Sequence, residues 1–189
     1  MTLLLYCYNP APEYEERQKE SEEWLRGAQR YVEVVKQPCI EERDYPNRVK
    51  NIWGKTDLII LEQDIVPPIH PGLALRDMML FMNEYELVAW RYLLYPLSTH
   101  LVSPVYAHRV WSNDSVGKRL RWIGPADFRA DYVGLGFAGI SLRVQNMIPK
   151  EMFDSVPTWR DVDRCLSEWT QKLGMQWYVP AMKCKHNHR

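Results

Sequence analysis

The stretch LIILEQDIVPP, residues 58–68, places four consecutive apolar residues directly before two carboxylates. Leu58–Leu61 predicts a short strand that is buried on both faces and ended by Pro67-Pro68. Such strands are typical of parallel sheets that are covered on both sides. Glu62 and Asp64 would then lie at the carboxyl end of a central strand, where open α/β sheets bind their ligands.

Outward from this strand, strand-like and helix-like segments alternate along the chain. The expected strands cover residues 2–8, 31–36, 58–61, 86–94 and 175–179. The expected helices cover residues 13–31, 48–53, 73–84 and 158–173, with Gly27 and Gly174 as helix stops and the loop of residues 132–143 leading into a further strand. This alternation predicts an α/β fold with a central, mostly parallel sheet flanked by helices.

The bulk composition narrows the class of partner. The chain has 189 residues, enough for a single domain with a full core, and its 24 basic residues balance 24 acidic ones. A neutral chain argues against nucleic acid or a membrane surface as the main partner. No segment has the roughly 20 apolar residues that would span a bilayer. The four cysteines lie far apart without CxxC spacing, which favours a reduced, cytoplasmic setting.

The two carboxylates after the buried strand suit a hard divalent cation. Mg²⁺ or Mn²⁺ typically takes one or two protein carboxylates and fills its other positions with substrate phosphates and water. The alternative is that Glu62 and Asp64 cap the next segment or lie in solvent. For an isolated ExD pattern, the two interpretations carry about equal weight.

The surrounding sequence resembles the nucleotide-sugar glycosyltransferases of the GT-A fold. Their mark is an apolar strand that ends in Asp-x-Asp, and LIILEQD matches it with Glu62 in place of the first aspartate and Asp64 as the second. The preceding segment, YPNRVKNIWGKTD, aligns without a gap on the family's "aRN.G...A.gey" segment. Asn47 falls on the family's asparagine, whereas Pro46 and Val49 replace its arginine and glycine.

Later segments follow the family order. GLGFAGISLR, residues 134–143, resembles the glycine-rich element that lies beside the donor sugar. WRDVDRCLSEWTQKLG, residues 159–174, resembles the family's "EDvDlcLRlrk.G" element, with Asp161 on the acidic position and Arg160 in place of the glutamate. A histidine after the last strand is typical of metal-dependent members, and His186 and His188 lie there.

The resemblance implies a single glycosyltransferase domain over residues 1–189, with a nucleotide-binding half at about 1–68 and an acceptor- and sugar-binding half at about 69–189. Such an enzyme moves a sugar from a nucleoside-diphosphate sugar to an acceptor hydroxyl of a glycan, a protein or a small molecule, with Mn²⁺ or Mg²⁺ as cofactor. The implied metal ligands are Asp64, Glu62 and His186. Asp161 is the implied catalytic base, with Asp163 as the alternative. The implied donor-binding residues are Tyr8, Asn9, Asn47, Glu62, Gly136 and Phe137.

Other interpretations remain open at this level. Gly134, Gly136 and Gly139 formally match the dinucleotide fingerprint GxGxxG, but the β-prone residues after Gly139 argue against the helix that this motif needs. Cys184, His186 and His188 alternate and could hold zinc, although without the usual paired spacing. Asp161 could simply stabilise a helix N-terminus.

Two alternative functions also remain. A metal-dependent nuclease or phosphohydrolase would use Asp57 together with Glu62 and Asp64. A catalytically silent module would bind the nucleotide sugar without transferring it.

Overall fold

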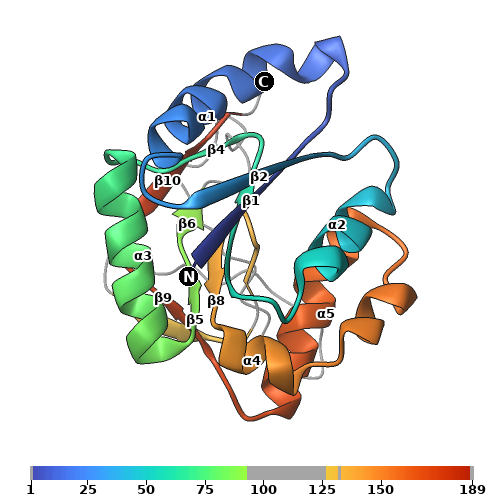
Figure 1. Ribbon diagram of the computed structural model, residues 1–189. Helices are drawn as coiled ribbons and strands as arrows, with labels where there is room; N and C mark the ends of the chain where they lie inside the picture. The colour runs from blue at the N-terminus through green and yellow to red at the C-terminus, as the bar shows by residue number, and fades with distance from the viewer. Residues whose placement is uncertain (1, 93–126, 132, 188–189) are drawn as a thin grey trace, which may run out of the picture.

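The computed structural model describes residues 2–92, 127–131 and 133–187, and this part of the chain forms a sheet with helices on both faces (Figure 1). The strands are β1 (Thr2–Tyr8), β2 (Glu33–Pro38), β3 (Asp57–Glu62), β4 (Ile65–Val66), β5 (Leu87–Ala89), β6 (Arg91–Tyr92), β7 (Phe128–Ala130), β8 (Phe137–Ile140), β9 (Trp177–Val179) and β10 (Lys183–His186). The α-helices are α1 (Glu15–Ala28), α2 (Asp44–Ile52), α3 (Pro71–Tyr85), α4 (Leu142–Met147) and α5 (Trp159–Lys172), and the 3₁₀ helices are η1 (Pro12–Tyr14) and η2 (Lys150–Ser155).

The large sheet has the strand order β2-β1-β3-β8-β5-β9-β7. β1 pairs in parallel with β2 and β3, and β5 pairs in parallel with β9. β8 runs antiparallel to both of its neighbours, β3 and β5, and β7 runs antiparallel to β9. Five of the seven strands therefore share one direction, so the expectation of a mostly parallel sheet flanked by helices is confirmed.

A small second sheet, in the order β4-β10-β6, connects the end of the described chain to its middle. β10 pairs antiparallel with β4 and parallel with β6. Figure 1 shows β10 and β4 beside α1, and the Lys185 ammonium lies 2.5 Å from a Glu20 carboxylate oxygen on that helix. The late strand β10 thus returns to the segment that directly follows β3.

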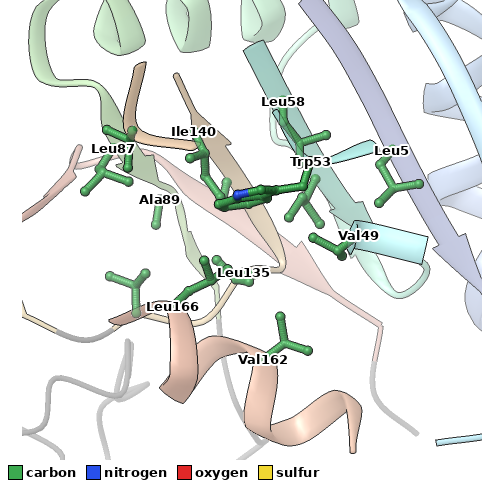
Figure 2. Close-up of a cluster of buried hydrophobic side chains, with 14 of the residues drawn as sticks. Leu5, Val49, Trp53, Leu58, Leu87, Ala89, Leu135, Ile140, Val162 and Leu166 are labelled. Carbon is green, nitrogen blue, oxygen red and sulfur yellow. The ribbon is translucent and has the colours of Figure 1, made fainter. Parts of the chain in front are cut away.

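Each face of the large sheet has its own apolar core, because the strand side chains alternate between the faces. On one face, α1 and α3 cover the sheet, and Trp24 and Met78 from these helices share one buried cluster with Leu4 and Ile59 from the strands. On the other face, α2, α4, α5 and η2 enclose a second cluster, in which Trp53 lies between the strands and α2 (Figure 2). The indole N–H of Trp53 donates to the carbonyl oxygens of residues 145 and 148, at 3.0 and 3.1 Å.

The structure corrects several expected element boundaries. The helix expected at residues 48–53 begins earlier, at Asp44. Pro46 does not prevent this, because it lies in the first turn, where a backbone N–H has no partner within the helix. Gly27 lies inside α1 and does not end it; a Cβ there would lie 2.9 Å from Cγ of Pro71 on α3, so this glycine permits close helix packing. Gly174 does end α5, with φ of 70°. The strand at residues 177–179 is followed by another, β10.

Within the described residues, no helix is both long enough and apolar enough to cross a bilayer.

Candidate functional site

A pocket of about 320 Å³ opens where three parallel strands end. Because β1, β2 and β3 run in the same direction, their carboxyl ends meet at one edge of the sheet. The lining residues come from these strand ends, from the following loops and from the starts of two helical segments: Cys7, Tyr8, Asn9, Tyr14, Cys39, Ile40, Glu41, Glu42, Tyr45, Glu62, Gln63 and Asp64. The edge predicted from the buried strand is therefore the edge that carries the pocket.

Glu62 and Asp64 both line this pocket, and the residue between them anchors the wall. The Gln63 Oε1 atom accepts hydrogen bonds from the backbone N–H of Asn9 and from Nε2 of Gln18, the latter at 2.9 Å. The Ser21 hydroxyl donates to the Gln63 carbonyl oxygen. These bonds tie the turn after β3 to the loop after β1, so Tyr8, Asn9 and the two carboxylates form one wall.

The Glu62 carboxyl lies among other acidic groups. Burial raises its pKa well above the usual value, and the nearby charges of Asp163 and Asp64 raise it further. The Tyr45 hydroxyl acts in the opposite direction and lowers the pKa of Glu62. Tyr45 is only 4% exposed, and its hydroxyl makes no geometrically good hydrogen bond within the described residues. The structure therefore gathers carboxyl groups at the end of β3, and this crowding favours the protonated form of Glu62.

Asp163, the alternative to Asp161, is the α5 residue whose charge acts on Glu62. Asp161 is engaged at the start of α5. Its Oδ2 atom accepts from the Thr158 hydroxyl at 2.9 Å, and its Oδ1 atom lies 3.1 Å from an Arg164 guanidinium nitrogen. These contacts are those of a residue that stabilises a helix N-terminus. Asp161 does not line the pocket with Glu62 and Asp64.

Three of the expected donor-binding residues do not line the pocket. Asn47 is exposed on α2. Gly136 is buried, and its carbonyl oxygen accepts from the Glu62 backbone N–H at 2.9 Å, so it holds the end of β3 in place. The Phe137 ring is fully buried and packs edge-on against Trp24 and Trp90 in the core. Phe137 belongs to the apolar core because its side chain points to the face of β8 that α1 and α3 cover.

His186 is brought close to the carboxylates through its backbone. It pairs with Ile65, the residue after Asp64, in the β10–β4 ladder. The next residue, Asn187, donates its backbone N–H to the Asp64 carbonyl oxygen at 2.8 Å. Cys184 is 3% exposed and packs in the core, which removes it from a zinc site with the tail histidines. His188 lies outside the described residues.

Asp57 is too far from the site to act with Glu62. The two residues begin and end β3, so five residue steps of about 3.3 Å separate them. The Asp57 carboxylate accepts instead from the backbone N–H of Leu142, at 2.7 Å, at the start of α4. The nuclease hypothesis thus loses one of its three carboxylates.

The glycine-rich element does not form a dinucleotide site. Gly139 lies inside β8, and α4 begins only at Leu142, whereas the GxGxxG motif needs a helix that opens at the third glycine. A Cβ at Gly139 would lie 2.5 Å from the Met82 sulfur and 2.8 Å from the Met78 sulfur. This glycine therefore permits α3 to approach the sheet.

The sequence analysis missed the pocket wall after β2. The Asp44 carboxylate accepts hydrogen bonds from the backbone N–H groups of Ile40 and Glu41, at 2.8 and 2.9 Å, and these bonds lower the pKa of Asp44. The loop is thereby held in one conformation beside Glu42. The expected strand at residues 31–36 could have predicted this wall. If that strand runs parallel to the first strand as its neighbour, the residues after it must lie at the same edge of the sheet.

Glu62, Asp64 and the other residues of the pocket wall could supply only some of the ligands that a divalent ion needs. Among the described side chains, no three histidine, cysteine, aspartate or glutamate groups converge as a metal site. Of the expected metal ligands, Glu62 and Asp64 line the pocket, and two carboxylates suffice for Mg²⁺ or Mn²⁺ when substrate phosphates supply the other ligands. The donor set therefore fits an ion that binds together with a phosphate-bearing ligand.

No protein-family model and no curated protein matches the chain. Among solved structures, the chain is similar to A197 from STIV, with a TM-score of 0.59 and 14% sequence identity. The match covers 100% of this chain and 87% of that one. At this identity, the similarity concerns the fold alone.

Proposed function

We propose that this protein is a metal-dependent glycosyltransferase that uses a nucleoside-diphosphate sugar as donor. The observation that carries the proposal is the pocket at the carboxyl ends of β1, β2 and β3, which Glu62 and Asp64 line together with Tyr8 and Asn9. This is the edge where open α/β sheets bind nucleotides. The same residues are those that the resemblance to the GT-A glycosyltransferases assigns to the metal and the nucleoside.

The charge of the pocket supports a requirement for a cation. Four of the twelve lining residues are carboxylates, namely Glu41, Glu42, Glu62 and Asp64, and none of the lining residues in the described part of the chain is lysine or arginine. A diphosphate would be repelled by such a wall unless a divalent ion lay between them. When bound, Mn²⁺ or Mg²⁺ would neutralise the charge that develops on the nucleoside diphosphate as it leaves.

The chain's own residues have separable roles in this proposal. Asp64, with Glu62, holds the ion, and His186 is the third candidate ligand, contributed by β10. Tyr8 offers an aromatic face at the pocket wall, where its ring stacks on Tyr6 at a centroid distance of 5.8 Å. Asp163 replaces Asp161 as the candidate base for the acceptor hydroxyl, because its charge acts at the end of β3 whereas Asp161 is engaged by Thr158 and Arg164.

Binding measurements with a metal and a panel of donors test the proposal. We expect one UDP-, GDP- or CMP-sugar to bind with Mn²⁺ by titration calorimetry and to bind at least tenfold more weakly with EDTA, a factor worth about 1.4 kcal/mol. Asp64→Ala should abolish the gain in donor affinity that Mn²⁺ gives. Asp154→Ala is the matched control, since Asp154 lies in an exposed ion pair with Lys50 away from the pocket.

Three results would argue for other functions. Unchanged binding in Asp64→Ala would remove this residue as the metal anchor. Tight binding of one donor without transfer to any acceptor in a broad panel would favour a silent binding module. Mg²⁺-dependent cleavage of DNA or RNA that is lost in Asp64→Ala would favour a nuclease.

A further inference from the structure

Two of the four cysteines lie together at the pocket, and neither belongs to the proposed metal or nucleotide contacts. Cys7 is the penultimate residue of β1, and Cys39 directly follows β2. In the parallel ladder, Cys7 pairs with Gln37, so Cys39, two residues further on, lies on the same face of the sheet as Cys7. Both cysteines line the pocket, and both pack on the core beneath α2 and α5.

The backbone holds the two residues together. The Cys39 N–H donates to the carbonyl oxygen of Tyr8, the neighbour of Cys7, at 2.7 Å. The Cys39 thiol donates to the carbonyl oxygen of Gln37, the residue that lies opposite Cys7 in the ladder, at 3.8 Å. Neighbouring strands lie about 4.8 Å apart, and Cys39 is offset from the partner of Cys7 by two residues of about 3.3 Å each. Disulfide-linked residues usually have Cα atoms about 4.4–6.8 Å apart, so closure requires the segment at Cys39 to move toward Cys7. Cys39 stands beyond the last ladder residue of β2, so its segment can adjust toward Cys7.

The two sulfurs differ in exposure. Cys7 is 5% exposed, whereas Cys39 is half-buried and open to the pocket. The neighbouring Cys7 thiol lowers the pKa of Cys39, which raises the fraction of the nucleophilic thiolate. By contrast, burial raises the pKa of Cys165 and of Cys184. Cys39 is therefore the thiol most suited to react with a small ligand that enters the pocket.

We propose that Cys7 and Cys39 form a dithiol site that reacts with low-molecular-weight disulfides and closes to an intramolecular disulfide at the pocket rim. The Cys39 thiolate attacks one sulfur of glutathione disulfide, forms a mixed disulfide and releases one glutathione thiolate. The Cys7 thiol then loses its proton to solvent and attacks the Cys39 sulfur, which expels the second glutathione. One disulfide is reduced and one is formed, so electrons balance. The reaction requires neither nucleotide nor metal.

The oxidised form would join the end of β1 covalently to the loop that carries Ile40, Glu41 and Glu42. This loop and the wall at Tyr8 border the same pocket. The bond would thus fix the spacing between two walls that only hydrogen bonds hold in the reduced form.

Intact-mass analysis and peptide mapping test this proposal on the full chain. The protein is reduced, desalted under argon and incubated with glutathione disulfide. We expect the mass to fall by two hydrogen atoms, a cross-linked peptide pair containing Cys7 and Cys39, and complete reversal by dithiothreitol. Cys165→Ser, the matched control, should behave like the wild type.

Two variants separate the steps. Cys7→Ala should accumulate one glutathionyl group on Cys39, because the resolving thiol is missing, and Cys39→Ser should gain none at Cys7. A wild-type chain that keeps four free thiols, that stops at the Cys39 mixed disulfide, or that cross-links Cys165 or Cys184 would overturn the proposal. The wild-type peptide map decides the question even if Cys7→Ala does not fold.

Discussion

The backbone N–H of Asn187 donates a hydrogen bond to the carbonyl oxygen of Asp64, at 2.8 Å. This contact joins the end of the described chain to the turn that follows β3, 123 residues earlier by their numbers. The neighbouring His186 is held opposite Ile65 in the same ladder. The β10 strand therefore has a fixed register on the segment that carries Asp64.

This register places the backbone of His186 near Asp64, so the proposal that His186 is the third metal ligand can be tested. We expect His186→Ala to weaken Mn²⁺-dependent donor binding by at least about tenfold, because loss of even the groups that support metal ligands typically costs this much. Titration calorimetry with and without EDTA measures the effect. His188→Ala is the matched control, and equal losses in both variants, or a loss only in His188→Ala, would assign the ligand differently.

The pH dependence of stability should report the acidic cluster around Glu62. Because folding raises the pKa of Glu62 above the usual 4.5, the folded state binds more protons, and stability falls as the pH rises from that value through the folded-state pKa. Glu62→Gln removes this cost. We expect the variant to match the wild type at about pH 3, where the carboxyl is protonated in both states, and to be more stable at about pH 7.

Urea denaturation in EDTA across this pH range measures the difference. Glu151→Gln, which changes an exposed carboxyl on η2, is the control and should leave the wild-type curve unchanged. A Glu62→Gln variant less stable than the wild type at neutral pH would show that the ionised carboxylate is satisfied in the folded protein.

Strands buried on both faces were the features most accessible to sequence analysis. The strands predicted at Leu58–Leu61 and at residues 2–8 are confirmed. In both, a continuous run of apolar side chains is removed from water because the sheet is covered on both faces. The direction of β8 was not accessible. Its residues, Phe137–Ile140, are equally suited to either direction, and only the pairing in the structure shows that it runs antiparallel to both β3 and β5.

The site was accessible only where a residue lies at the end of a recognised strand or just after it. Tyr8 ends the first strand, Asn9 and Glu62 directly follow a predicted strand and Asp64 lies two residues later, and all four line the pocket. Phe137 and Asn47 were assigned by motif alignment, which does not say to which side of the sheet or helix a side chain points. The Tyr45 hydroxyl was missed because its helix was expected to begin later.

Gln145 should be the side chain on which the turn before β3 depends. It is 1% exposed, its Oε1 accepts from the Gly54 N–H at 2.9 Å, and its Nε2 donates to the carbonyl oxygens of Thr56 and Ile140 at 2.8 and 2.9 Å. Each buried group left without a partner costs about 1–3 kcal/mol. We expect Gln145→Leu to lower the free energy of unfolding by about 3 kcal/mol or more in urea denaturation.

Gln176→Leu is the control for this change. Gln176 is exposed and its side chain donates to the Asp131 carboxylate. The substitution should therefore change the free energy of unfolding by no more than about 0.5 kcal/mol. Equal effects of the two substitutions would mean that water replaces the bonds of Gln145.

Gly139 should be required for the packing of α3 on the sheet. A methyl group there would meet the Met82 and Met78 sulfurs at 2.5 and 2.8 Å, so Gly139→Ala should cost about 1–3 kcal/mol by overpacking. Met82→Ala opens space at this point, and the double variant should therefore lose less stability than the sum of the two single changes. Leu80→Ala, at a side chain 57% exposed on the same helix, is the matched partner and should combine additively with Gly139→Ala. Additive behaviour with Met82→Ala as well, in urea denaturation, would show that α3 shifts as a whole to make room for the methyl group.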